Sequence, residues 1–299
     1  MFTMMNNARL AVGLQGVAVA ERATQQALAY AKDRRQGRSL RGGADGMAPI
    51  IDHPDVKRML LTMKGFTAAA RAICYMTAEA IDRAHLSPDE TARKAANERA
   101  SLLTPVAKAF STDIANEVAS IGVQVHGGMG FVEETGAAQH YRDARIAPIY
   151  EGTNGIQAID LVVRKLPLGG GDHVHGLIGE FHADIEAVRL SNREGFGATA
   201  AKCDAALNDL SEATAFLQKA LGAGRVDEAL AGATPYLRLF ALAAGGAYLA
   251  RGAIADDSGK RIAFCRFYAE NIIEETAALR RRVMEGGPSL LDAGAALVA

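Results

Sequence analysis

The sequence has few cysteines and almost no net charge, and each scarcity excludes a class of protein. Its three cysteines lie far apart, without a CxxC pair, so neither a disulfide framework nor a zinc site is predicted, and a reducing cytoplasm is favoured. A net charge of −1 gives no indication of a nucleic-acid partner or an anionic membrane surface. No stretch approaches the roughly 18 apolar residues of a membrane span. We therefore expect a soluble globular protein of about two domains.

Proline is also scarce, and alternating β-branched runs are absent, whereas alanine is abundant. These features predict an all-α fold of two antiparallel helix bundles. In the first bundle, Ser87 as the N-cap and Pro88 as the first helical residue predict the start of a long helix, in which Pro105 predicts a kink or break. A polar, glycine-rich loop is expected at 37–52. The expected helices of this bundle cover approximately residues 3–33, 54–83, 87–125 and 135–144.

The clearest boundary is the segment 166–172, in which a proline and three consecutive glycines cannot continue a helix. It predicts one domain at 1–165 and a second at 166–299. The second domain should contain helices at about 174–192, 197–221, 226–251 and 260–285, followed by a loop or frayed tail from Gly286. Three histidines near its start suggest a metal site, but their spacing does not place them on one helical face, so a solvated helix start is favoured: His173, His175 and His182.

The most informative segment is Ile-Tyr-Glu-Gly-Thr-Asn-Gly at 149–155. Gly152 permits a sharp turn, and Thr153 or Asn154 can cap a helix whose apolar face follows. Glu151 thus has a fixed backbone and a free carboxylate, which suits a positioned base. Taken alone, the segment favours the structural explanation, which is a negative charge stabilised near a helix N-terminus.

Two further segments carry candidate chemistry. The first is Gln-Val-His-Gly-Gly-Met-Gly-Phe at 124–131, where backbone amides could approach a phosphate-bearing ligand. A helix C-cap with a turn explains this segment equally well. The second is Tyr-Ala-Lys-Asp-Arg-Arg at 30–35, which ends the first helix with positive charge. Complementing the helix dipole is the structural explanation there.

The order and spacing of these segments resemble the C-terminal helical domain of the flavin-dependent acyl-CoA dehydrogenases. That family has a Tyr-Ala-x-x-Arg helix end, a Gln-x-x-Gly-Gly-x-Gly turn, an Arg-Asp-x-x-Ile stretch and Tyr-Glu-Gly-Thr. This chain has all four, with Arg142-Asp143 beginning the third, and it also has the family's Ala-Lys-Ala-Phe phrase at 107–110. The resemblance covers approximately residues 1–165. Residues 166–299 are similar, in position and helical character, to the extra C-terminal domain of members with about 600 residues. Enzymes that act on methylmercaptopropionyl-CoA and on fatty acyl-CoA are among those members.

The resemblance implies that Glu151 is the catalytic base that removes the α-proton of an acyl-CoA thioester while FAD takes a hydride from the β-carbon. It implies an acyl-CoA substrate, an electron-transfer flavoprotein or similar acceptor, and a homodimer. The FAD contacts would be Arg34, Gln124, Gly127, Gly128 and Thr153. The substrate contacts would be Arg9, Tyr150 and Gly152, with no metal in the site.

Some features depart from the family pattern. Gly155 stands where many shorter relatives have glutamine, and Asn6 stands where many have aspartate. The N-terminal helical domain and middle β-domain of the family have no counterpart in this chain, which suggests a truncated product or a fragment. The alternative function is therefore a non-enzymatic helical oligomerisation module, an inactive remnant of the family.

Overall fold

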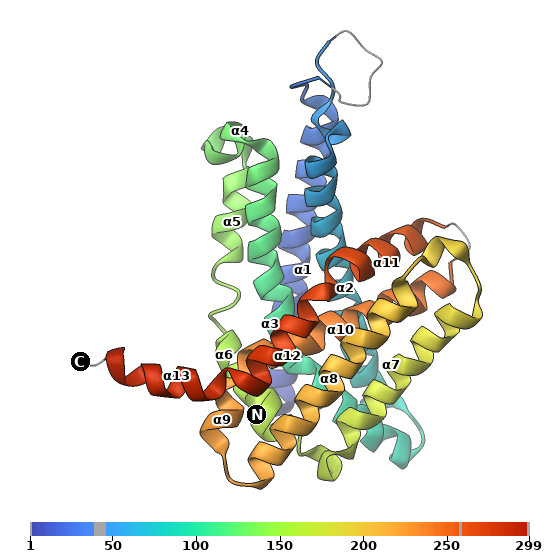
Figure 1. Ribbon diagram of the computed structural model, residues 1–299, viewed down its shortest axis with the longest axis vertical. Coiled ribbons are helices and arrows are strands. Elements are labelled where there is room, and N and C mark those ends of the chain that lie inside the picture. Colours follow the sequence, from blue (N-terminus) through green and yellow to red (C-terminus); the bar gives the residue numbers. More distant parts are fainter. Residues whose placement is uncertain (1, 39–45, 257–258, 298–299) are drawn as a thin grey trace.

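The computed structural model describes residues 2–38, 46–256 and 259–297, and these residues form helices without any β-strand. The predicted all-α class is confirmed. Three long helices make the first bundle, and they run side by side along the long axis of the molecule (Figure 1). They are α1 (Phe2–Asp33), α2 (Pro54–Leu86) and α3 (Glu90–His126). The loop predicted at 37–52 includes residues 39–45, which lie outside the described residues, and it ends in the short helix η1 (Ile50–Asp52).

Short helices complete this half of the chain. After α3 come α4 (Gly128–Phe131), η2 (Glu133–Thr135), α5 (Ala137–Ala144) and α6 (Asn154–Ile159), which continues as the π-helical segment η3 (Asp160–Lys165). Helix α1 approaches α3 closely, because a Cβ atom on Gly16 would lie only 2.5 Å from the carbonyl oxygen of Ser111. This contact brings the N-terminal half of α1 against the middle of α3, where the candidate site lies.

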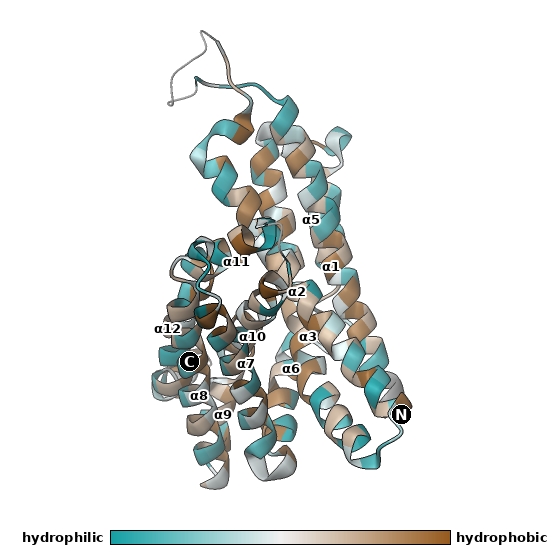
Figure 2. Ribbon diagram, turned by 90° about the vertical axis from the view of Figure 1, so that its right-hand side faces the viewer, coloured by the Kyte–Doolittle hydropathy of each residue, from teal (hydrophilic) through white to brown (hydrophobic). Residues whose placement is uncertain are grey.

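The predicted break at 166–172 is present. Gly169, Gly170 and Gly171 have φ angles of 61°, 72° and 97°, which side-chain-bearing residues rarely adopt. The second half follows η4 (Leu168–Gly171) and stands beside the lower part of the first bundle (Figure 2). Its elements are α7 (Asp172–Leu190), η5 (Glu194–Phe196), α8 (Thr199–Gly222), α9 (Val226–Ala231), α10 (Ala233–Ile254), α11 (Lys260–Asn271), η6 (Ile273–Glu275), α12 (Thr276–Glu285), α13 (Gly287–Gly294) and η7 (Ala295–Leu297).

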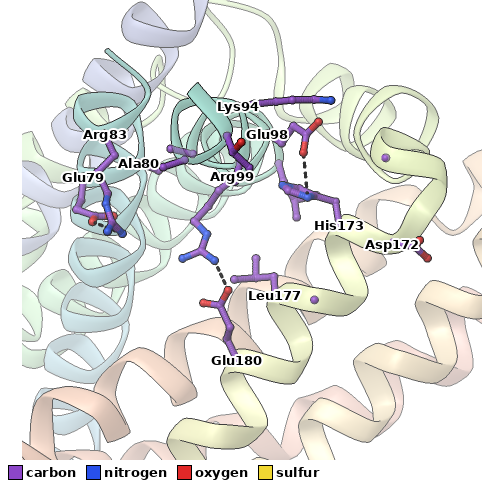
Figure 3. Close-up of a pocket in the computed structure, with 17 residues that line it drawn as sticks. Glu79, Ala80, Arg83, Lys94, Glu98, Arg99, Asp172, His173, Leu177 and Glu180 are labelled. Atoms are coloured by element: carbon purple, nitrogen blue, oxygen red, sulfur yellow. Dashed lines mark hydrogen bonds and ion pairs between the residues drawn. The ribbon is translucent and has the colours of Figure 1, made fainter. Parts of the chain in front are cut away.

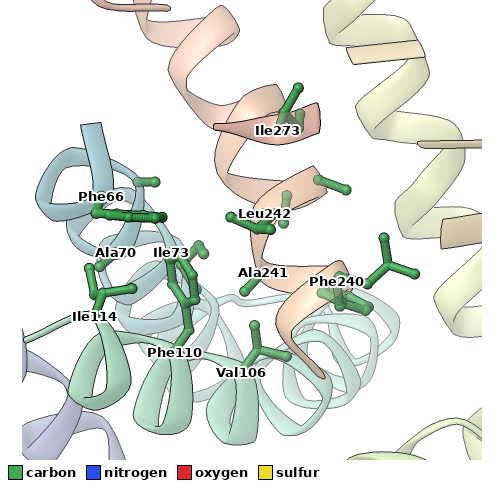
Figure 4. Close-up of a cluster of buried hydrophobic side chains, with 14 of the residues drawn as sticks. Phe66, Ala70, Ile73, Val106, Phe110, Ile114, Phe240, Ala241, Leu242 and Ile273 are labelled. Atoms are coloured by element: carbon green, nitrogen blue, oxygen red, sulfur yellow. The ribbon is translucent and has the colours of Figure 1, made fainter. Parts of the chain in front are cut away.

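The two halves share one continuous hydrophobic core. Phe66 of α2 and Phe110 of α3 pack edge to face and lie opposite the buried segment Phe240–Leu242 of α10 (Figure 4). Helix α10 is long and apolar enough to cross a membrane by length and composition, contrary to the expectation from the sequence. However, 72% of its most apolar window is buried inside the fold, as in a core helix. The division into domains at 1–165 and 166–299 stays a prediction.

Five local predictions are wrong. Helix α3 is capped by Asp89, whose carboxylate accepts a hydrogen bond of 2.8 Å from the amide of Ala92, and not by Ser87. Pro105 does not break α3, because buried contacts with α1 and α2 hold the helix on both sides of it. The helix predicted at 226–251 is divided near Gly232, and the one at 260–285 is divided near η6. The predicted tail from Gly286 is largely the helix α13, with a proline in its first turn.

Candidate active site

Glu151 lies on a turn between α5 and α6 that has an unusual backbone. Its φ angle is +56°, and that of Gly152 is +85°, so two consecutive residues are left-handed. Thr153 caps α6 by accepting a hydrogen bond of 3.3 Å from the amide of Ile156, as one of the two predicted caps. A left-handed conformation costs a residue with a side chain about 1–2 kcal/mol. Neighbouring groups must therefore hold the turn in this shape.

Two side chains hold it from the side of α3 and α6. Lys108 is completely buried, and its Nζ donates hydrogen bonds to the carbonyl oxygen of Gly152 (2.9 Å) and to Oδ1 of Asn154 (2.8 Å). Nε2 of Gln157 donates longer bonds to the carbonyl oxygens of Glu151 (3.4 Å) and Gly152 (3.3 Å). A hydrogen bond from a charged donor contributes about 1.5–3 kcal/mol, enough to offset the cost of one left-handed residue. Glu151 itself is half-buried, and no described residue forms a hydrogen bond or ion pair with its carboxylate.

The electrostatics of this turn are dominated by Lys108. Burial lowers its pKa from 10.5 to about 8, and Arg9 adds to that decrease, whereas the carboxylates of Asp113 and Glu151 oppose it. Glu151 is therefore near enough to Lys108 for their charges to interact. The amine needs only its hydrogen atoms to bond the turn, and it keeps two of them in the neutral form.

The predicted substrate residues lie around the same turn. Arg9 of α1 forms an ion pair of 3.0 Å with the buried carboxylate of Asp160, and its guanidinium lies about 4.0 Å from the position that a Cβ atom would take on Gly152. The hydroxyl of Tyr150 donates to the side chain of Gln15. The structure thus brings Glu151, Arg9, Tyr150, Gly152 and Thr153 together. A cavity of about 350 Å³ adjoins Arg9, and its polar lining residues include Asn6, His85, Asn97, Ser101 and Arg164.

The predicted cofactor residues form a second group, four of them at the C-terminal end of α3. Arg34, Gln124, Gly127 and Gly128 line one cleft of about 580 Å³. Space is open where a Cβ atom would project from either glycine, so a ligand can reach the backbone there. At the base of the cleft, the rings of Tyr30 and His126 stack with centroids 4.4 Å apart, and Nδ1 of His126 lies 2.7 Å from the carbonyl oxygen of Gly122.

The two groups are well separated. Residues 108 and 124 lie in one continuous helix, which rises about 1.5 Å per residue, so about 24 Å separates them along the axis of α3. The exception is Thr153, a predicted cofactor contact that lies at the Glu151 turn and away from the other four. A compact ligand cannot reach both groups.

Other polar clusters are satisfied internally. A larger cleft of about 640 Å³ lies between α2, α3 and α7 (Figure 3). Most of its charges pair with one another, as in Glu79 with Arg83 and Arg99 with Glu180, so it lacks a set of free acid–base groups. The three histidines near the glycine break have separate partners: His173 with Glu98, His175 with Gln218 and His182 with Asp204. Within residues 2–38, 46–256 and 259–297, no cluster of three or more His, Cys, Asp or Glu could hold a metal ion.

Comparison with known proteins decides the family. The family model described as acyl-CoA dehydrogenase, C-terminal domain, matches residues 1–166. The chain belongs to the acyl-CoA dehydrogenase family. A second model of this kind, described as acetyl-CoA dehydrogenase C-terminal like, matches residues 177–294. The resemblance read from the motifs of the first half is therefore confirmed.

Several acyl-CoA dehydrogenases resemble this chain. The 3-methylmercaptopropionyl-CoA dehydrogenase of Ruegeria pomeroyi is 44% identical over 98% of this chain and 51% of its own length. A butyryl-CoA dehydrogenase of Syntrophomonas wolfei is 36% identical over 58% of this chain and 28% of its own length. The chain thus spans about half the length of the first of these relatives and a smaller share of the second.

Solved structures show the same fold. Acyl-CoA dehydrogenase complexed with FAD from Bacillus anthracis has a TM-score of 0.71 and 19% identity, over 99% of this chain and 52% of its own. ACDH-11 of Caenorhabditis elegans, in complex with C11-CoA, has a TM-score of 0.72 and 20% identity, over 94% of this chain and 47% of its own. At these identities the likeness concerns the fold alone.

The sequence analysis missed the residues that support the Glu151 turn. Lys108 is the lysine of the Ala-Lys-Ala-Phe phrase at 107–110. That phrase contributes to the family resemblance, but the sequence assigns no separate role to the lysine. A lysine surrounded by buried apolar residues of α3 is the signal that could have identified it, because lysine is rarely buried without a function or a partner. Asn154 was considered only as a helix cap, whereas its side chain bonds α3 instead.

Proposed function

We propose that this chain is the catalytic C-terminal part of an FAD-dependent acyl-CoA dehydrogenase. The observation that carries the proposal is the Glu151 turn, which presents an unpaired, half-buried carboxylate on a left-handed backbone held by hydrogen bonds. Family membership adds that the first relative bears the name of a dehydrogenase of an acyl-CoA thioester. The chain corresponds to about half of that relative, so the reaction of the complete protein is part of what we propose.

In the proposed reaction, Glu151 takes the α-proton of the acyl-CoA thioester. The α-proton is weakly acidic, so the carboxylate must be positioned before it can act. The amide of Gly152 is our candidate donor to the thioester carbonyl, where negative charge develops as the proton leaves. Bound FAD would supply the acceptor for the hydride of the β-carbon, a task that no side chain can perform. Arg9 and Tyr150 are proposed to shape the substrate pocket beside the turn.

The cleft at the far end of α3 fits a phosphate-bearing cofactor. Arg34 supplies a guanidinium whose observed side-chain bond is a 3.2 Å contact with Gln36. Gln124 adds an amide, and the exposed backbone at Gly127 and Gly128 adds N–H groups without a side chain in the way. These are the donor types that bind a dinucleotide. We propose that they contact FAD together with Thr153, and that in a dimer these two groups of one chain contact different FAD molecules.

The proposal extends to the oligomeric state, the electron acceptor and the location of the complete protein. We propose a homodimer, since the two separated groups of cofactor residues support it. We propose an electron-transfer flavoprotein or similar acceptor, because a relative from Acetobacterium woodii, 33% identical over half of this chain, is a subunit of a caffeyl-CoA reductase–Etf complex. A cytoplasmic location is supported by three buried free cysteines.

Titration of FAD into the purified chain, followed by flavin fluorescence, tests the cofactor proposal. We expect saturable binding that Arg34→Met weakens by about 10–150-fold, the equivalent of one charge-assisted hydrogen bond of about 1.5–3 kcal/mol. Gly128→Leu should also weaken it, because the new side chain enters the cleft and meets no protein atom within 4 Å at its Cβ. Arg58→Met, on the exposed surface of α2, is the control.

Absence of any saturable FAD binding would contradict the proposal that this chain binds the cofactor by itself. It would favour the alternative of a helical oligomerisation module. Equal weakening by Arg34→Met and Arg58→Met would show that the cleft is not the site.

A further inference from the structure

Lys108 has a position that helix packing alone does not explain. It is completely buried in α3, between apolar residues that fill the core. A lysine in such a place normally pairs with a carboxylate, yet no described carboxylate lies within ion-pair distance of its Nζ. Its observed hydrogen bonds go instead to Gly152 and Asn154, at the turn that carries Glu151.

Asn154 joins the turn to further residues of α3. Its Oδ1 accepts from Lys108, and its Nδ2 donates to Oδ1 of Asp113 (2.7 Å), to Oγ1 of Thr112 (2.9 Å) and to the carbonyl oxygen of Ala109 (3.1 Å). The side chain therefore uses both ends of its amide on α3. The backbone of the turn is fixed to the middle of that helix by one lysine and one asparagine.

We propose that Lys108 is a positioning residue for the catalytic base, because it holds the left-handed Glu151–Gly152 turn through the Gly152 carbonyl and the Asn154 side chain. This inference rests on the proposed function, because Glu151 acts as a base only in the proposed reaction. The hydrogen bonds themselves are independent of flavin and substrate. The proposal deepens the proposed function by adding a residue that acts through the backbone of the base.

The charges that face Lys108 come from several elements. Asp113 lies on the same helix, Arg9 on α1 and Glu151 on the turn, and each affects the pKa of Lys108. Asp160, on η3, is bound to Arg9. Burial raises the pKa of the Asp113 carboxyl, and the charge of Arg238 on α10 is among the contributions that oppose this increase. Because burial brings the pKa of Lys108 to about 8, its protonation changes within an accessible pH range.

The sequence permits a direct measurement at the accepting carbonyl. Gly152-Thr153 is the single Gly-Thr pair in the chain, and Tyr150-Glu151 is the single Tyr-Glu pair. Labelling glycine with carbonyl ¹³C and threonine with ¹⁵N therefore gives one carbonyl–amide NMR cross-peak, which reports the Gly152 carbonyl. The corresponding tyrosine and glutamate labels give one peak for the Glu151 amide.

We expect the Gly152 peak of the unmodified chain to move with pH, with a midpoint near 8. In Lys108→Met both peaks should be displaced, and the movement around that midpoint should be lost. Lys219→Met removes an exposed lysine from α8 and is the matched control, with both peaks as in the unmodified chain. A simple loss of packing would displace peaks in the variant, but it would not produce the titration in the unmodified chain.

A Gly152 peak that stays stationary between about pH 7 and 11, a range that includes the lowered and the ordinary pKa of a lysine, would overturn the proposal, and so would an unchanged titration in Lys108→Met. If the variant does not fold, the titration of the unmodified chain decides by itself. The FAD titration decides the proposed function separately, so the two can fail independently.

Discussion

Replacing Gly152 with alanine should destabilise the chain, whereas the same change at Gly155, three residues away, should stabilise it. At Gly152 the φ angle is +85°, and the new Cβ would lie 3.0 Å from Nε2 of Gln157, the amide that bonds the turn. At Gly155, in the first turn of α6, the nearest atom is Oγ1 of Thr153 at 3.9 Å, an ordinary contact. The two positions therefore differ in backbone conformation and in available space.

The expected magnitudes follow from these two differences. A side chain in the left-handed region costs about 1–2 kcal/mol. Displacement of Gln157 weakens two long hydrogen bonds, each contributing about 0.5 kcal/mol, so Gly152→Ala should lower the free energy of unfolding by about 2–3 kcal/mol. Gly155→Ala lowers the entropy of the unfolded chain and should raise the same free energy by up to about 1 kcal/mol.

Equilibrium urea unfolding, followed by the circular dichroism of the helices, measures both values under identical conditions. The account requires changes of opposite sign. A Gly152→Ala chain as stable as the unmodified one would show that the left-handed turn is not held as described. Loss of stability in Gly155→Ala would contradict either the helical conformation of Gly155 in α6 or the space that the structure shows beside it.

Three further predictions concern the supporting structure. Arg238→Met should lower the free energy of unfolding by about 2 kcal/mol, because the guanidinium is three-quarters buried between two glutamates of α3 and η6. This value lies between those of exposed and buried ion pairs. An unchanged urea midpoint would contradict it. Because the pKa of Lys108 is lower in the folded state, the unfolded chain binds more protons between about pH 8 and 10.5, so stability should rise with pH in that window more steeply than in Lys108→Met; parallel curves from urea unfolding would refute it. Burial raises the pKa of every cysteine thiol, so an aromatic disulfide reagent should label them only after unfolding, and rapid labelling of the folded chain would disagree with their burial: Cys74, Cys203 and Cys265.

Much of the fold could be predicted because local signals and tertiary packing agree in the long helices. Pro54 begins α2 as expected, and Gly127, at a φ angle of 62°, ends α3. Pro105 misled the prediction of a break because a lost backbone hydrogen bond is a local effect, whereas the contacts that keep α3 one continuous helix come from α1 and α2. The helix at 287–294 was missed because its glycines and proline are also typical of a loop.

The candidate site was predictable to the extent that it is local in sequence. The Thr153 cap follows from residue type and position, and the turn that presents Glu151 follows from its glycine. The support from Lys108 was not predictable in this way, because the bond joins residues 44 positions apart in the chain. A lysine in a helix is ordinarily exposed, and only the packing of α3 beneath the turn shows its role.

The central claim is that Glu151 removes a proton from an acyl-CoA thioester. A fusion that joins the first half of the Ruegeria pomeroyi relative to residues 1–299 allows a direct test, with acyl-CoA-dependent reduction of an artificial electron acceptor as the assay. We expect the fusion to bind FAD and turn over, and its Glu151→Gln form to keep the flavin absorbance and lose turnover. Retained turnover in Glu151→Gln would contradict the assignment of Glu151 as the base.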